Sequence, residues 1–93
     1  MGGGEIRLHV IFRGRVQGVS FRAYAKSFAD SCGVKGWVKN LADGSVEAVF
    51  DGPAESVYRV IELCRTGNPF ARVSSLTTEE IERSSELKCF SIE

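Results

Sequence analysis

The residues best suited to chemistry lie between Gly14 and Arg22, in the segment GRVQGVSFR. Gly14 and Gly18 allow the backbone to turn several N–H groups toward one point, an arrangement that binds anions. A predicted helix follows, and its first N–H groups lack helical partners and carry the positive end of the helix dipole. Arg22, in the first turn, adds a guanidinium whose forked donors match phosphate oxygens. These features predict a binding site for a small phosphate group.

A simpler interpretation of this segment stays open, namely an ordinary strand-to-helix turn with a surface arginine. The helix dipole disfavours a cation near a helix N-terminus, so a bound anion would account for Arg22. The segment is not a Walker A loop, because the second glycine and the Lys-Ser/Thr pair do not stand at the required spacing. It is not the loop of a cysteine phosphatase, since no cysteine precedes Arg22 to act as the nucleophile.

Asn40 is the second candidate. It stands at the end of a predicted strand and before a turn, where asparagine often satisfies only backbone groups. Its amide can also orient a water molecule without changing charge. The single histidine, His9, falls on the polar face of another predicted strand, and we interpret it as a solvated side chain. No cluster of histidine, cysteine and carboxylate has the spacing of a metal site, so we expect neither a metal nor a cofactor.

The elements that must position these candidates follow from apolar spacing. Residues 6–12 alternate between apolar and polar types, as a half-buried strand does. Residues 21–32 place apolar side chains at helical spacing, with Ser20 able to cap this helix and Gly33 to end it. The remaining predicted elements are strands over 34–40, 45–51, 73–81 and 89–93 and a helix over 53–66.

The resulting order is β-α-β-β-α-β with a short final strand, which predicts an α+β protein of the ferredoxin-like class. We expect a mainly antiparallel sheet, with the third strand between the first two and both helices on one face. The other face is then solvated, which accounts for Arg7, His9 and Arg13. Because the first two strands are parallel, their C-terminal ends share one edge. The glycine loop and Asn40 should therefore lie together.

Length and composition limit the function further. The 93 residues suffice for one domain, and we expect a flexible tail over residues 1–5 and a single domain over residues 6–93. Twelve basic residues balance twelve acidic ones, which argues against nucleic-acid and membrane partners. Cys32, Cys64 and Cys89 form no CxxC pair and are expected to be small apolar residues, with Cys32 and Cys64 unbonded to each other. We expect a cytoplasmic monomer.

These features together resemble those of the acylphosphatase family. The resemblance covers nearly the whole chain and includes two separate signatures of the family, the phosphate loop and the segment around Asn40. It implies an enzyme that hydrolyses the carboxyl–phosphate bond of acyl phosphates without a metal or cofactor, with inorganic phosphate as product and inhibitor. The segments that carry it are Gly14–Arg22, Gly36–Asn40, Asp43–Gly44, Val46–Glu47, Gly52–Pro53, Asn68–Val73 and Phe90–Ile92.

The resemblance also implies roles for individual residues. The catalytic arginine of the family corresponds to Arg22, and its catalytic asparagine, which positions the attacking water, corresponds to Asn40. Ser20 stands where the family often has glycine or phenylalanine, and we expect it to cap the helix and to leave activity intact. The residues that the resemblance assigns to phosphate binding are Arg15, Val16, Gln17, Gly18, Val19 and Arg22.

Two other functions stay open at this point. One is the acylphosphatase-like domain of a larger carbamoyl-transfer enzyme, which the short chain disfavours. The other is a module on the same fold that binds a small anion or a nucleic acid, because fold does not determine function. Zero net charge disfavours the nucleic acid. Turnover of an acyl phosphate by a substoichiometric amount of protein distinguishes an enzyme from a binding module.

Overall fold

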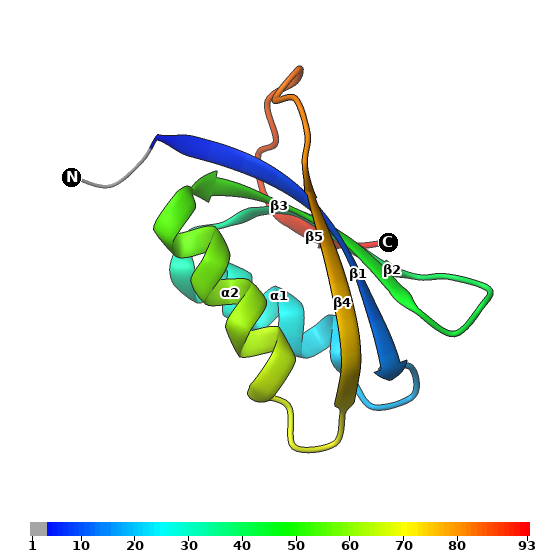
Figure 1. Cartoon of the computed structure of the whole chain (residues 1–93). Helices are drawn as coiled ribbons and strands as arrows, with labels where there is room; N and C mark the ends of the chain where they lie inside the picture. Colours follow the sequence, from blue (N-terminus) through cyan, green and yellow to red (C-terminus); the bar gives the residue numbers. More distant parts are fainter. Residues whose placement is uncertain (1–3) are drawn as a thin grey trace.

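The computed structural model describes residues 4–93, which form a five-stranded sheet covered on one face by two helices (Figure 1). The strand order is β4-β1-β3-β2-β5, so β3 lies between β1 and β2 and is antiparallel to both. β5 extends the sheet by pairing parallel to β2. The predicted ferredoxin-like arrangement is confirmed. The elements are β1 (Glu5–Arg15), α1 (Phe21–Cys32), β2 (Lys35–Asn40), β3 (Val46–Pro53), α2 (Ala54–Thr66), β4 (Arg72–Glu80) and β5 (Phe90–Ile92).

The first strand is longer than predicted at its N-terminal end. β1 begins at Glu5, so this residue belongs to the sheet and not to the tail predicted over residues 1–5. The carbonyl of Gly4 accepts a hydrogen bond from the N–H of Ala54 at 3.2 Å, which ties the start of the strand to the start of α2. The rest of the predicted tail, residues 1–3, lies outside the described residues.

β1 also extends further at its C-terminal end, where we expected the glycine loop to begin. Gly14 and Arg15 still pair with β4, beyond a bulge between Arg13 and Gly14. Gly14 has a φ of 125°, and a Cβ at this position would lie 2.3 Å from the carbonyl oxygen of Arg72. Gly14 therefore permits the close approach of β1 and β4. The prediction that it lines the loop is wrong, and the loop proper covers residues 16–20.

The core lies between the helices and one face of the sheet. Leu8, Val10 and Phe12 are buried at alternate positions of β1, as strand periodicity predicts. The Phe12 and Phe21 rings lie 5.0 Å apart between centroids, which fixes the start of α1 against the end of β1 and so frames the loop between them. The buried residues of the helices are Phe21, Ala25 and Ala29 in α1 and Val57, Val60, Ile61 and Cys64 in α2.

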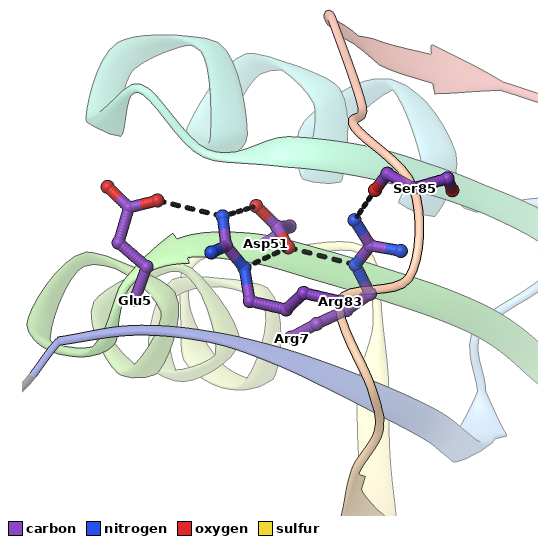
Figure 2. Close-up of polar contacts among 5 residues, drawn as sticks. All are labelled: Glu5, Arg7, Asp51, Arg83 and Ser85. Carbon is purple, nitrogen blue, oxygen red and sulfur yellow. Dashed lines mark hydrogen bonds and ion pairs between the residues drawn. The ribbon is translucent and has the colours of Figure 1, made fainter.

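The other face of the sheet is less solvated than predicted, because the segment between β4 and β5 crosses part of it. Arg7 is only 6% exposed and Asp51 only 5%. Figure 2 shows Arg7 and Arg83 converging on the Asp51 carboxylate, with N···O distances of 2.8 and 2.9 Å. Arg7 also donates to the carbonyl of Ser85. The prediction of a solvated face is wrong for Arg7 and holds for the exposed Arg13.

All three cysteines are free thiols, so the prediction that Cys32 and Cys64 are unbonded is confirmed. Cys64 is buried in α2, whereas Cys89 is exposed ahead of β5. Within residues 4–93, no helix has the length and apolar character needed to cross a membrane.

Candidate active site

The candidate site lies at the edge of the sheet where β1 and β2 end. A depression of about 220 Å³ opens there, and both Arg22 and Asn40 line it. The topology explains this meeting, because β1 and β2 run in the same direction on either side of β3 and end at the same edge (Figure 1). The other lining residues are Val16, Gly18, Ser20, Phe21, Ala23 and Ile92.

The loop over residues 16–20 is anchored in the core at its start and turns sharply before α1. Val16 is 1% exposed and anchors the loop in the core. Gly18 has a φ of 75° and Ser20 a φ of 61°, so both residues adopt the left-handed region. Only the second is unusual, because side chains other than glycine rarely occupy this region. Two left-handed residues within three positions turn the chain tightly into α1.

Ser20 does not cap α1 with its side chain, although the sequence predicts this. A capping hydroxyl reaches the first free N–H groups from an extended backbone, and Ser20 is left-handed instead. Its carbonyl begins the helix by accepting from the N–H of Tyr24 at 3.0 Å. The first turn of α1 holds no acidic residue. The first amides of α1 thus have neither a capping side chain from Ser20 nor a carboxylate in their own turn. The first three residues of the helix, Phe21, Arg22 and Ala23, line the depression.

Arg22 is half-buried in the first turn of α1, and its Nη1 donates to the backbone oxygen of Glu93 at 3.2 Å. Glu93 is held in turn, because its N–H donates to the carbonyl of Val38 in β2 at 2.8 Å. Within the described part of the chain, Glu93 is the one hydrogen-bond partner of the Arg22 side chain. The guanidinium therefore keeps most of its five donors for another acceptor.

Two side-chain amides hold the loop in place from opposite sides. Nε2 of Gln17 donates to the carbonyls of Leu41 and Ser45, at 2.8 Å each, in the turn that follows Asn40. On the other side, Nδ2 of Asn68 donates to the carbonyl of Val19 at 3.1 Å. The loop is thereby tied both to the β2–β3 turn and to the segment before β4.

The turn after Asn40 has its own internal support. The Asp43 carboxylate accepts hydrogen bonds from the hydroxyl and the N–H of Ser45. These bonds, above all the one from the hydroxyl, hold the pKa of Asp43 below its usual value. Ser45 is buried at 4% exposure. Its burial and its bonds to Asp43 hold the turn in one shape, and so they hold the two carbonyls that accept hydrogen bonds from Gln17.

The structure therefore separates the predicted phosphate-binding residues into three groups. Val16, Gly18 and Arg22 line the depression that holds Asn40. Arg15 and Val19 instead line a neighbouring depression. The Gln17 side chain faces the β2–β3 turn, and Gln17 does not line the depression.

Groups that could hold a metal are missing from the described chain. Across residues 4–93, no three histidine, cysteine or carboxylate side chains come together. His9, which we predicted to be solvated, is half-buried in β1, with its Nε2 2.6 Å from the Glu47 carboxylate. Neither residue lines the depression of Arg22 and Asn40. The polar side chains that line the depression are those of Arg22, Asn40 and Ser20.

Comparison with known proteins decides which family combines this fold with these residues. A family model described as Acylphosphatase matches residues 8–92. The chain belongs to the acylphosphatase family. A curated acylphosphatase of Syntrophobacter fumaroxidans is 48% identical to it over 86 residues, covering 92% of this chain and 89% of the relative. As a member of the family, the chain is an enzyme that acts on acyl phosphates.

Solved acylphosphatase structures have the same architecture. The crystal structure of acylphosphatase from Bacillus subtilis superposes with a TM-score of 0.90 at 35% identity, covering 95% of this chain and 98% of that one. An acylphosphatase from Coxiella burnetii gives a TM-score of 0.89 at 37% identity, covering 97% of this chain and 94% of that one. The fold and the family are therefore consistent over residues 8–92.

Sequence reasoning missed the residues that position this candidate site. Gln17 is predicted only as part of the phosphate loop, and its contact with the carbonyl of Leu41 joins residues 24 positions apart. Asn68 carries a weak local signal, because Asn-Pro pairs favour turns. Ile92 is predicted only as part of the last strand and Glu93 carries no signal, since their place at the site depends on the pairing of β5 with β2.

Proposed function

We propose that this chain hydrolyses the carboxyl–phosphate bond of acyl phosphates, with Arg22 and the loop amides of residues 15–19 binding the phosphoryl group and Asn40 orienting the attacking water. The observation that carries the proposal is the shared depression, which places Arg22 and Asn40 around one space of about 220 Å³ beside the loop. Family membership supports the same assignment.

Arg22 is suited to phosphate binding by its position and by its free donors. Its tether to Glu93 directs the guanidinium toward the depression and uses one donor. The positive end of the α1 dipole lies beside it, and no carboxylate of the first turn competes for it. The Arg22 guanidinium and the positive end of the α1 dipole repel each other. When a phosphate with two negative charges lies between them, it attracts both.

Asn40 is suited to water positioning because it is polar without being charged. It ends β2 at the mouth of the depression and is exposed to solvent. Its carbonyl oxygen can accept a hydrogen bond from the water while its NH₂ group donates elsewhere. A carboxylate in the same place would repel the phosphoryl oxygens at short range. An amide therefore orients the nucleophile without raising the negative charge of the site.

The reaction is suited to a site without a general acid. The water oxygen forms a bond to phosphorus as the bond to the carboxyl oxygen breaks, and the electron pair leaves with the carboxylate. The proton of the water passes to a phosphoryl oxygen of the product. Because a carboxylate is a good leaving group, positioning and charge stabilisation supply most of the catalysis. A phosphomonoester, whose leaving group is an alkoxide that needs a proton, should not be turned over.

Kinetics of three variants test the roles. Arg22→Ala should weaken inhibition by inorganic phosphate by about 10- to 100-fold, the loss of hydrogen bonds to a charged group, and should also lower turnover. Asn40→Ala should lower kcat by about 10²-fold, comparable to losing one preorganised polar contact, while the phosphate Ki stays within about threefold. Asn40→Asp should weaken phosphate inhibition as well, because of charge repulsion.

Arg59→Ala is the matched control, because Arg59 is exposed on α2 and lies outside the depression. Thermal unfolding of each variant verifies the fold. If Asn40→Ala abolishes phosphate inhibition and keeps a normal kcat, the two roles are assigned wrongly. Loss of activity in EDTA that magnesium restores would contradict a site built from Arg22 and amides. The cytoplasmic location and the monomeric state stay predictions, the second testable by light scattering.

A further inference from the structure

A second depression borders the first at the same edge of the sheet. It has a volume of about 570 Å³. Gly18 and Ser20 line both depressions, so these two residues form the ridge between them. A Cβ at Gly18 would find no heavy atom within 4 Å, which makes this the open point of the ridge. We define the acyl groove by the residues lining the second depression, which are Arg15, Gly18, Val19, Ser20, Pro69 and Phe70.

The acyl groove lies on the side of the loop opposite Asn40. In the sheet, β4 is the neighbour of β1 on one side, and β3 and β2 follow on the other. The segment before β4 carries Pro69 and Phe70, and the end of β2 carries Asn40. Figure 1 shows the connection before β4 and the loop after β1 at the same end of the sheet. The loop over residues 16–20 thus separates Asn40 from Phe70.

The wall of the acyl groove is held rigidly. Asn68 is 5% exposed, and its Oδ1 accepts from the N–H of Phe70 at 2.9 Å. Its Nδ2 donates to the carbonyl of Val19 at 3.1 Å, so the same side chain fixes Phe70 relative to the loop. The carbonyl of Asn68 also accepts from the N–H of Ala71 at 3.2 Å. The Phe70 ring itself is 63% exposed.

In-line displacement at phosphorus links the two depressions. The attacking and leaving oxygens lie roughly in line, on opposite sides of the phosphorus. If Asn40 holds the water, the carboxylate leaves on the far side, across the ridge at Gly18. We propose that the acyl groove receives the acyl group of the substrate and that Phe70 selects aromatic or extended apolar acyl groups. This inference rests on the roles proposed for Arg22 and Asn40.

The chemistry of the acyl groove fits such an acyl group. Phe70 presents an apolar ring, and Arg15, which also lines the groove, has a guanidinium that can stack on an aromatic face. An acetyl group ends at one methyl beyond the carboxyl carbon and reaches little of this surface. A benzoyl group extends a planar ring over the ridge and can contact Phe70.

Exposure alone does not distinguish Phe70, because single apolar residues are common on protein surfaces. Tyr58, on α2, is similarly exposed at 58%. What distinguishes Phe70 is the groove that it lines, the two residues shared with the Arg22 depression and the buried Asn68 that holds its backbone. Tyr58 lines neither depression and therefore provides a matched aromatic control.

The test compares benzoyl phosphate with acetyl phosphate on the full chain. The readout is the ratio of kcat/KM for the two substrates, measured by phosphate release. Phe70→Ala should lower this ratio by about three- to tenfold, the size of an aromatic contact. Phe70→Tyr should keep the ratio, since it retains the ring. Tyr58→Ala should leave it at the wild-type value.

Each outcome either supports the acyl groove or overturns it. A ratio that Phe70→Ala lowers and Phe70→Tyr preserves supports it. A ratio that is the same in Phe70→Ala, Tyr58→Ala and wild type overturns it. If acetyl phosphate is still hydrolysed in that case, the proposed function stands. Thermal unfolding separates lost selectivity from lost folding. Acetyl phosphate turnover that persists in Arg22→Ala is the distinct failure of the proposed function.

Discussion

The side-chain amide of Gln17 donates a hydrogen bond to the carbonyl oxygen of Leu41 at 2.8 Å. The same nitrogen donates to the carbonyl of Ser45, also at 2.8 Å, so one side chain spans the mouth of the β2–β3 turn. Asn40 immediately precedes Leu41 and ends β2. Gln17 therefore sets the distance between the loop over residues 16–20 and the residue proposed to hold the water.

Removal of this tie should reduce catalysis more than folding. Gln17→Ala should lower kcat by about tenfold, because Asn40 loses its fixed relation to the loop and small displacements are costly at a reacting centre. The loss of stability should be about 1–2 kcal/mol, since two part-buried carbonyls lose a donor. Steady-state kinetics and urea unfolding measure the two effects.

Gln17→Glu adds a readout that a purely structural role would not change. At neutral pH its carboxylate would face two carbonyl oxygens, and activity should fall below that of Gln17→Ala. Protonation restores one donor, so activity relative to wild type should rise as the pH approaches about 4.3, the ordinary glutamate pKa. Ser74→Ala, which removes an exposed hydroxyl bonded to the carbonyl of Arg13, is the control. A flat pH profile for Gln17→Glu would argue against a positioning role.

The sequence predicts the helices and strands, but not the hydrogen bonds and close contacts that join them. Apolar spacing in the segment from Phe21 to Cys32 predicts α1 with the bounds observed, because an amphipathic stripe is a local property. The bulge at Gly14 could not be predicted, since it depends on how closely Arg72 of β4 approaches. The position of Asn40 followed from topology, whereas its tie through Gln17 depends on side-chain reach.

Arg7 is the clearest case in which the alternation of apolar and polar residues predicts solvent exposure and the side chain is buried. Alternation correctly places Arg7 on the face away from the helices. It contains no information about residues 81–89, which lie more than 70 positions later and cross that face. Long-range coverage of this kind is fixed by the pairing of Arg7 and Arg83 with Asp51.

The Asp51 cluster should make the fold sensitive to acid. The hydrogen bond from Arg83, and then that from Arg7, hold the pKa of Asp51 below the ordinary value of 3.8, although burial opposes them. A lowered folded-state pKa means that the stabilisation is complete above pH 3.8 and is lost as the pH falls through the lower folded value. Thermal unfolding from pH 7 down to pH 2 should show this loss.

Asp51→Asn should remove that part of the acid sensitivity. It should also lower stability at pH 7 by about 3–5 kcal/mol, because Arg7 is left buried without its counter-charge. Glu55→Gln, which changes an exposed carboxylate on α2, should leave both the stability and its pH profile near wild type. A wild-type acid profile in Asp51→Asn would show that other groups govern acid unfolding.

The three thiols should differ strongly in reactivity. Burial raises the pKa of Cys64 to about 12, so almost no thiolate forms at pH 8 in the folded state. Cys89 is exposed and should react with a disulfide reagent in the native protein. Mass spectrometry after brief labelling should find Cys89 modified and Cys64 unmodified until denaturant is added. Cys89→Ser should lose the fast phase, and rapid native labelling of Cys64 would contradict its place in the core.

Ser20→Gly should stabilise the protein, which is unusual for a glycine substitution next to a helix. Ser20 makes no side-chain cap bond and has a φ of 61°, a conformation that costs about 1–2 kcal/mol in residues other than glycine. Glycine removes this strain. The unfolded chain with glycine has more conformational entropy, which offsets about 0.4–1 kcal/mol of the gain in stability. The expected gain in the free energy of unfolding is therefore about 0.5–1 kcal/mol, measured by urea unfolding, with activity retained.

Ser27→Gly is the matched control, because Ser27 is exposed within α1. This substitution should lower stability by about 0.5 kcal/mol through helix propensity. If Ser20→Gly destabilises as much as Ser27→Gly, the Ser20 hydroxyl does cap α1 in solution, and the free amides proposed to bind phosphate would have a competing partner.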